Sequence, residues 1–121
     1  VTTLPRSVPI IEDLVFKYGM ERYCRKVRSA NIEVLALEND ETRAQKNLLI
    51  EIKNAIEEDQ CEAIILGCAG MTDLTPWLSK EAGIPVIDGV VSALKIVEAL
   101  IGAGLKTSKA GGYSTPIPKE L

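Results

Sequence analysis

The chain has 121 residues, is 46% hydrophobic and carries a formal net charge of −3. Its length suits one domain of ordinary size, and the small charge without a basic run excludes a typical nucleic-acid-binding protein. No apolar stretch approaches the roughly 18 to 20 residues that a membrane span needs, so we expect no membrane partner.

The numbers of histidines and cysteines limit which catalytic and metal sites the chain can form. The chain has no histidine, which excludes Ser-His-Asp and Cys-His pairs and His-ligated metal sites within it. Its three cysteines, Cys24, Cys61 and Cys68, form no CxxC motif, so we expect no metal site. Their odd number favours free thiols in a reducing cytoplasm over a disulfide framework. Proton transfer would therefore use Asp, Glu, Lys, Tyr or Cys side chains.

Segments with apolar residues at helical spacing alternate along the chain with short continuous apolar runs. In chain order, the expected strands are residues 1–3, 32–37, 63–66 and 84–87, and the expected helices are residues 7–19, 39–59, 72–83 and 89–104. Ser7 and Thr72 are the candidate N-caps of the first and third helices, and Gly19 and Gly83 end these helices.

This alternation of strands and helices predicts βαβ units and an α/β fold of the flavodoxin-like kind. We expect a parallel four-stranded sheet with helices on both faces and residues 32–37 at one edge. Residues 1–104 would form this domain, and the Gly-, Pro- and Ser-rich residues 105–121 would form an extended arm. The first strand is shorter than the usual 5 to 6 residues or so, and we therefore expect the carboxyl-terminal part of a longer polypeptide.

The sequence GCAGM, residues 67–71, directly follows the apolar strand expected at residues 63–66. Ligands of parallel α/β folds gather at the carboxyl ends of strands, where this loop would meet residues 2–7 and 87–90. The small residues around Cys68 leave room for a ligand, and backbone N–H groups of the turn would favour an anion or a thiolate. Such a thiol could act as a nucleophile or a base, although a buried structural thiol explains its position equally well.

The other two cysteines lie in different contexts. Cys24 is in the polar stretch ERYCRKVRS, and Cys61 precedes a strand without any Gly-rich loop. We expect both to be ordinary buried thiols without a catalytic role.

Four segments together carry a resemblance to a known family. They are TTLPRSVPIIEDL (2–14), AIILGCAGM (63–71), GIPVIDGVVSAL (83–94) and GLKTSKAGGYSTPIPKE (104–120). In combination they resemble the hydantoin and allantoin racemases of the aspartate/glutamate racemase superfamily. The resemblance implies a cofactor-independent enzyme of two α/β domains that holds a small hydantoin or allantoin molecule between two cysteines. One cysteine, as thiolate, removes the α-proton, and the other, as thiol, returns a proton to the opposite face; Cys68 falls on the second cysteine of this pattern.

The resemblance also implies substrate-binding residues. Thr2 and Thr3 match the pair of threonines that lines the pocket in this family, and they could bind the polar edge of the ring. We expect Gly67, Ala69 and Gly70 to contact the substrate as well. The N–H groups of the last two would bind the oxygen on which charge develops as the proton leaves.

The first cysteine of the family's pair belongs to an amino-terminal domain, and neither Cys24 nor Cys61 has a matching context. The resemblance therefore implies a missing amino-terminal domain that supplies the second thiol and on which residues 105–121 pack. A truncated first strand would leave an unpaired sheet edge, so we expect the chain to form homo-oligomers. We expect Asp88 to be a turn or cap residue, because a carboxylate beside an enolate would repel it.

Two alternatives remain open. One is an amino-acid racemase or decarboxylase of the same superfamily, in which a single cysteine can be enough for protonation; GCAGM together with GLKTSK favours the hydantoin branch. The other is an inactive flavodoxin-like module for binding or assembly, and the lack of a phosphate loop such as GxGxxG speaks against it.

Overall fold

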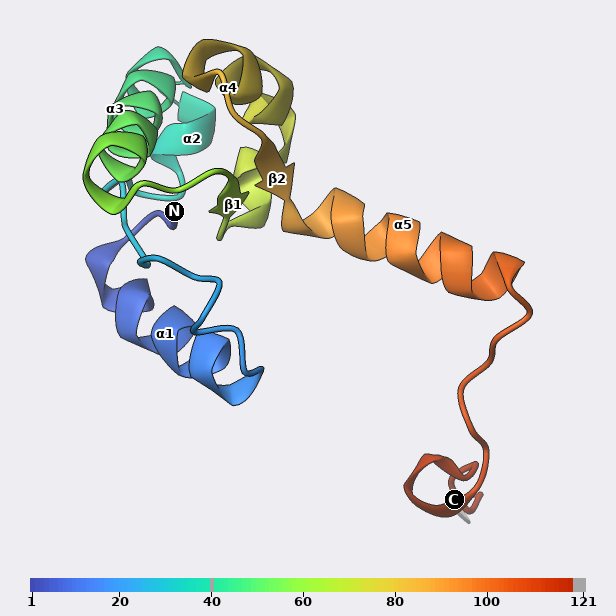
Figure 1. Cartoon of the computed structure of the whole chain (residues 1–121). Helices are drawn as coiled ribbons and strands as arrows, with labels where there is room; N and C mark the ends of the chain where they lie inside the picture. The colour runs from blue at the N-terminus through green and yellow to red at the C-terminus, as the bar shows by residue number, and fades with distance from the viewer. Residues whose placement is uncertain (40, 119–121) are drawn as a thin grey trace.

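A computed structural model describes residues 1–39 and 41–118 of the chain. Figure 1 shows its elements, which in chain order are η1 (Pro5–Ser7), α1 (Val8–Lys17), α2 (Ala36–Asn39), α3 (Glu41–Asp59), β1 (Ile64–Leu66), η2 (Ala69–Leu74), α4 (Thr75–Ala82), β2 (Val86–Asp88), α5 (Gly89–Gly102) and η3 (Gly111–Tyr113). Within the described ranges, no helix combines the length and the apolar character needed to cross a membrane.

The four expected long helices form as α1, α3, α4 and α5, and glycines end two of them as expected. Gly19 follows α1 with φ 67°, and Gly83 ends α4 with φ 71°, a left-handed conformation that glycine adopts without strain. Neither of the two expected N-cap residues caps its helix through a side-chain hydrogen bond. Ser7 makes no capping hydrogen bond because it is already helical within η1, and the Thr72 hydroxyl donates to the Ala69 carbonyl at 2.8 Å inside η2.

Of the four expected strands, the described residues form two, β1 and β2, which pair in parallel as predicted. Ile64 lies opposite Val86, and Leu66 lies opposite Asp88. The α/β class with a parallel sheet is therefore confirmed. Within the described residues this sheet has two strands instead of the four that were expected.

Residues 1–3 lie between β1 and residues 28–32, although they form a single parallel bridge, from Thr2 to Ser29. On one side, the Gly67 N–H donates to the Val1 carbonyl at 2.8 Å. On the other side, the Thr2 N–H donates to the carbonyl of residue 28 at 2.7 Å, and the Thr2 carbonyl accepts from the N–H of residue 30 at 2.9 Å. Residues 1–3 thus lie between two neighbouring parallel segments, as an inner strand of a parallel sheet does.

The expected strand at residues 32–37 was wrong. The segment that pairs with residues 1–3 ends at Ile32, whose N–H donates to the Thr3 carbonyl at 2.9 Å, and α2 begins at Ala36. Ile32 and Leu37 are both buried, but a helical turn brings Leu37 into the core. The alternating apolar pattern therefore indicated burial correctly and the backbone conformation incorrectly.

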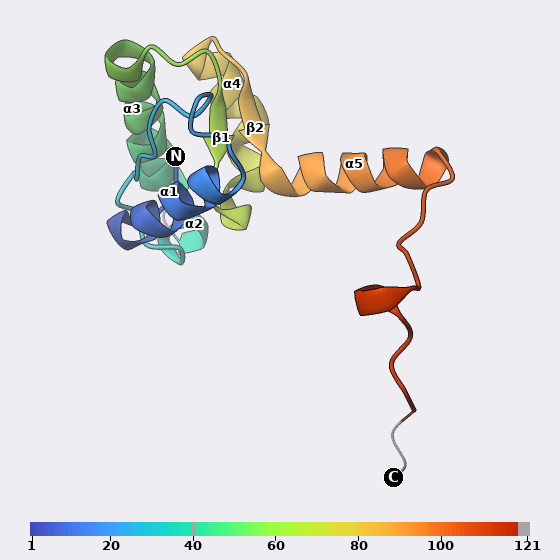
Figure 2. The same cartoon turned by 60° about the horizontal axis from the view of Figure 1, so that its bottom comes forward.

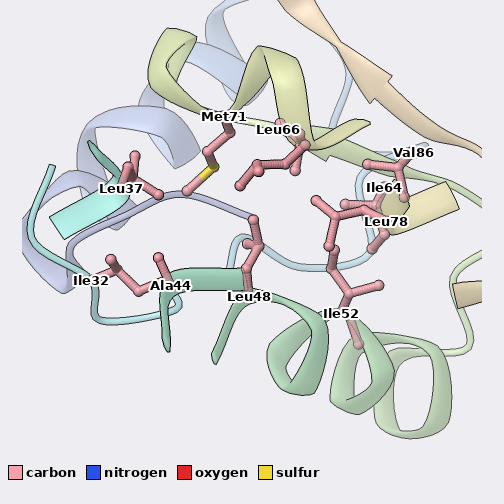
Figure 3. Close-up of a cluster of buried hydrophobic side chains, with 12 residues drawn as sticks. Ile32, Leu37, Ala44, Leu48, Ile52, Ile64, Leu66, Met71, Leu78 and Val86 are labelled. Atoms are coloured by element: carbon pink, nitrogen blue, oxygen red, sulfur yellow. The ribbon is translucent and has the colours of Figure 1, made fainter. Parts of the chain in front are cut away.

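The core fills one face of the β1–β2 pair, which α3 and α4 cover. Figure 3 shows Ile64 and Leu66 of β1 and Val86 of β2 on the side of α3, where Leu48 and Ile52 are fully buried on the helix face predicted from spacing. The buried apolar side chains are Ile32, Leu37, Ala44, Leu48, Ile52, Ala55, Ile64, Leu66, Met71, Leu74, Leu78 and Val86. Their burial removes apolar surface from water and holds the strands against the helices.

The other face of the β1–β2 pair is open. Ile65 and Ile87 point to it, and their side chains are 65% and 39% exposed. Between this face, α1 and residues 22–28 lies a groove of about 600 Å³, which we call the α1 groove. Helix α5 does not cover this face: it runs away from the body, and the described part of the arm continues beyond it (Figures 1 and 2).

A buried arginine links the segment beside Thr2 to helix α3. The Arg28 side chain is 9% exposed, and both its Nε and its Nη2 donate to the Asp59 carboxylate, the latter at 2.7 Å. Its Nη1 lies 3.0 Å from a Glu51 oxygen, and its Nη2 lies 2.6 Å from a Glu58 oxygen. Hydrogen bonds from Arg28, and the positive charge of Lys26, hold the pKa of Asp59 below its usual range.

We expect Asp59→Asn to lower the free energy of unfolding by about 1 to 2 kcal/mol at pH 7, because a charged bidentate partner of Arg28 is lost. The pKa of Asp59 is lower in the folded chain than its unfolded value of about 3.9, so the pair stabilises the fold above that pH. The difference between the variant and the wild type should therefore shrink as the pH falls through the folded pKa.

Urea denaturation between pH 3 and 7 measures this difference. Glu57→Gln is the matched control, since Glu57 is an exposed carboxylate on the same helix. Equal losses for the two variants, or a loss for Asp59→Asn that is independent of pH, would contradict the role given to this pair.

Candidate functional site

The carboxyl ends of the parallel segments meet at one edge, as the sequence predicted. Leu66 at the end of β1 lies opposite Asp88 at the end of β2, and Thr2 lies beside Gly67 on the other side of β1. Cys68 follows immediately, so the loop that contains it lies between residues 2–3 and the start of α5. Loops at this edge are where parallel α/β folds bind ligands.

Gly67 permits the close approach of residues 1–3 to β1. A Cβ atom at Gly67 would lie 3.2 Å from the Thr2 Cβ, 3.4 Å from the Ile11 Cδ1 and 3.4 Å from the Val1 carbonyl oxygen. The first of these distances is tighter than ordinary van der Waals contact. The missing side chain therefore sets how near Thr2 lies to the Cys68 loop.

Cys68 is half-buried and has an extended backbone, and it directly precedes η2. The first hydrogen bond of η2 runs from the Met71 N–H to the Cys68 carbonyl, at 3.1 Å. The N–H groups of Ala69 and Gly70 precede this bond and thus have no partner within η2. A Cβ at Gly70 would lie 3.8 Å from the Cys68 sulfur and 3.2 Å from Leu37, so a glycine here keeps the backbone beside the thiol uncovered.

Thr2 and Thr3 are both deeply buried. Their side chains are 2% and 5% exposed. The Thr2 hydroxyl donates to the Gly67 carbonyl across 3.5 Å, at the limit of a hydrogen bond. Thr2 is thus next to the Cys68 loop, where its hydroxyl has only a weak partner, and the Thr3 carbonyl binds the Ile32 N–H instead.

Asp88 is the N-cap of α5, as expected of a cap residue. Its carboxylate accepts from the Val91 N–H at 2.6 Å, and the Ser92 hydroxyl donates to its carbonyl at 2.6 Å. The Thr72 side chain and the hydrogen bond from the Val91 N–H, in that order of effect, hold the pKa of Asp88 below its usual range. Thr72, read from the sequence only as a helix cap, thus connects the Cys68 loop to the start of α5.

Cys24 and Cys61 are only half-buried, contrary to the expectation of buried thiols, and both line the α1 groove. Cys61 precedes β1 and Cys68 follows it, and an extended chain over this interval spans roughly 20 Å. The groove lining includes Thr2 and Gly67 but not Cys68. The structure therefore does not bring a second thiol of the described residues to Cys68.

Residues 1–39 and 41–118 contain no group of three or more His, Cys, Asp or Glu side chains that could hold a metal ion. The chemical capacity of this edge therefore lies in one thiol, two free backbone N–H groups and two threonine hydroxyls. Together these groups can bind a small polar molecule and move a proton at one of its faces.

Residues 1–97 match the protein family described as Asp/Glu/Hydantoin racemase. A hydantoin racemase from Rhizobium meliloti is 60% identical over 116 residues, which are 96% of this chain and 48% of that protein. A hydantoin racemase from Pseudomonas sp. (strain NS671) is 46% identical over 120 residues, 99% of this chain and 48% of that protein. The chain spans about half the length of the curated relatives it matches.

Two solved structures are similar over nearly the whole chain. Allantoin racemase from Pseudomonas fluorescens has a TM-score of 0.87 at 42% identity and covers 99% of this chain and 51% of its own. Allantoin racemase from Klebsiella pneumoniae has a TM-score of 0.89 at 42% identity and covers 99% of this chain and 49% of its own. The α/β fold described above is therefore similar to about half of each structure.

We expect Gly67→Ala to lower the free energy of unfolding by about 1 to 3 kcal/mol, because the added methyl group forces Thr2 away from β1. Gly89→Ala is the matched control: a Cβ there would meet no atom within 4 Å, at the first residue of α5. Guanidinium denaturation of both variants measures the difference. Equal stability of the two would show that the approach at Gly67 is not constrained.

We expect Cys68 to react with limiting iodoacetamide several times faster than the other two thiols near neutral pH. Small residues on both sides of Cys68, Gly67, Ala69 and Gly70, leave its sulfur open to a reagent. Peptide mapping by mass spectrometry after partial labelling of the folded chain locates the adduct. Preferential labelling of Cys24 or Cys61, which line the α1 groove, would contradict this expectation.

Proposed function

This chain belongs to the Asp/Glu/hydantoin racemase family, and from this premise we propose that it forms one half of a racemase for 5-substituted hydantoins or allantoin. Cys68 is its acid/base group and acts on one face of the substrate. The observation that carries this proposal is the position of the Cys68 thiol at a strand end, beside two backbone N–H groups without partners in η2. The hydantoin and allantoin racemases among its relatives and structural neighbours support the substrate class.

The proposed reaction is a proton exchange at the carbon next to a carbonyl. The Cys68 thiolate takes the α-proton, the C–H electron pair moves into the ring, and negative charge develops on the carbonyl oxygen. The N–H groups of Ala69 and Gly70 donate to that oxygen, which stabilises the charge as it forms. A proton returned to the opposite face gives the other enantiomer, and a proton returned by Cys68 gives the starting one. No redox change and no cofactor enter this balance.

Racemisation needs a second acid/base group on the far face of the substrate, and we propose that a companion domain supplies it as a thiol. The length of the relatives supports this, because this chain accounts for about half of each. In this proposal residues 1–104 are the catalytic α/β half, and residues 105–121 form an arm that packs on the companion.

Thr2 and Thr3 form the wall of the proposed pocket behind Gly67. Both side chains are buried, so they act at short range on a substrate that lies against the Cys68 loop. The 3.5 Å contact of the Thr2 hydroxyl with the Gly67 carbonyl is weak enough for that hydroxyl to turn to a polar ring atom.

Proton exchange by the 121-residue chain in deuterium oxide tests the proposal. Each enantiomer of a 5-alkyl hydantoin and of allantoin is followed by proton NMR for loss of the α-proton and by polarimetry for loss of rotation. We expect exchange of one enantiomer above the buffer background with its rotation retained, because a single base returns the deuteron to its own face. Cys68→Ser should slow this exchange by roughly 100-fold or more.

Cys61→Ser is the matched control, since it alters a half-buried thiol in the α1 groove and leaves the Cys68 loop unchanged. It should exchange at the wild-type rate. Undiminished exchange by Cys68→Ser would make Cys68 a structural thiol. Loss of rotation at the rate of exchange would instead contradict the need for a second thiol from a companion domain.

A further inference from the structure

The loop that contains Cys68 has a glycine on each side, and each glycine packs against a different segment of the chain. A Cβ atom at Gly67 would lie 3.2 Å from the Thr2 Cβ. A Cβ atom at Gly70 would lie 3.2 Å from the Leu37 Cδ1. Both distances are tighter than ordinary van der Waals contact. The Cys68 loop is therefore held from two sides, by residues 2–3 and by the turn that carries Leu37.

The contact between Leu37 and Gly70 lies next to the thiol of the candidate site. The same Cβ position at Gly70 is 3.8 Å from the Cys68 sulfur, so the leucine methyl group and the sulfur both border one face of this glycine. The Gly70 N–H has no partner within η2 and is one of the two donors that the proposed function assigns to the substrate oxygen. A side chain that limits where Gly70 can lie therefore limits where this donor points.

A helical turn brings Leu37 to this position. Ile32 is the last residue that pairs with residues 1–3. The chain then turns, and the Leu37 N–H donates to the Val34 carbonyl at 3.1 Å. An extended chain from residue 32 to residue 37 would instead span roughly 16 Å and would continue past the strand ends. The turn that replaces the expected strand thus places Leu37 against the Cys68 loop.

The Leu37 side chain has little room to move away from Gly70. It is 7% exposed and belongs to the buried apolar cluster, in which Figure 3 also shows Met71. Met71 is fully buried, follows Gly70 directly and donates its N–H to the Cys68 carbonyl at 3.1 Å. A close-packed interior yields little to an added atom, so the cluster transmits a displacement at Gly70 to the Cys68 loop.

We propose that Leu37 is a positioning residue of the candidate site, and that its contact with Gly70 holds the loop in the form in which this glycine borders the Cys68 thiol. The inference rests on the proposed function for the task of the Gly70 N–H. The effect of the contact on the thiol itself is independent of that function. Thr2 and Leu37, which come from different segments, then fix the two ends of one short loop.

A steric rescue tests the proposal through the reactivity of the Cys68 thiol toward limiting iodoacetamide. Gly70→Ala adds a methyl group that clashes with Leu37, so the loop should shift and the alkylation rate of Cys68 should fall about threefold or more. Leu37→Val removes the δ methyl groups, and in the double variant it should return this rate to within about twofold of the wild type. Cys61 in the same sample is the internal standard for peptide mapping.

Proton exchange in deuterium oxide gives a second readout that a general loss of stability would not reproduce. A displaced Gly70 N–H binds the oxygen less well as charge develops on it, so Gly70→Ala should lower kcat about tenfold or more, with KM within about twofold. Leu37→Val should restore kcat in the double variant. A wild-type chain that shows no exchange would contradict the proposed function, and the alkylation rates would still decide the role of Leu37.

Leu78→Val is the matched control, because Leu78 is a fully buried leucine of the same cluster and lies more than 4 Å from a Cβ at Gly70. Combined with Gly70→Ala, it should restore neither rate. Far-UV circular dichroism shows which variants fold. If Gly70→Ala does not fold, recovery of folding by Leu37→Val and not by Leu78→Val supports the proposal in the same way.

Three results would overturn the proposal. One is a Gly70→Ala chain with the wild-type alkylation rate, which would show that the glycine is not constrained by Leu37. Another is a loss that Leu37→Val does not relieve, because the added methyl group would then act on the thiol directly. The third is equal rescue by Leu78→Val, since a general loosening of the core would then be the cause.

Discussion

The contact between Thr2 and Gly67 is the constraint on which the rest of the site depends. Gly67 has no side chain, so residues 1–3 can lie against β1 and bond to it. The other edge of Thr2 binds the backbone at Arg28, whose guanidinium is held by carboxylates of α3. One continuous set of contacts thus runs from α3 to the Cys68 loop. Buried charged hydrogen bonds at one end and close backbone packing at the other limit how far the loop can shift.

The two faces of the β1–β2 pair differ in what covers them. Helices α3 and α4 cover one face, where alternate strand residues are fully buried. The other face has α1 at its side only, and Ile65 stands open beside the α1 groove. Helix α5 begins directly after β2 and runs away from the body, so it does not cover this face (Figures 1 and 2).

The reactive groups of the candidate site lie together at one end of β1. Cys68 and the N–H groups of Ala69 and Gly70 lie together directly after the end of β1. The other two thiols line the α1 groove, and Cys61 precedes β1 whereas Cys68 follows it. Inversion at a carbon needs proton donors and acceptors on two faces, whereas exchange with retention needs one. In the proposed function, this chain therefore supplies the groups for one face of the substrate.

The sequence by itself determined the elements that local patterns encode. The apolar stripe of α3, the glycine that ends α4 and the small-residue loop around Cys68 were all predicted, because spacing and backbone freedom act within a few residues. The tertiary structure decided which segment pairs with residues 1–3, because the hydrogen bonds between them join residues far apart in sequence. The paired segment ends at Ile32, and the chain then turns into α2 instead of continuing as a strand. It also decided the direction of α5, which depends on how closely a helix follows its strand and on the cap at Asp88. Local periodicity indicates which residues share an apolar face, and only the packed chain decides whether that face is buried: the apolar face of α3 is, whereas no residue of α5 is.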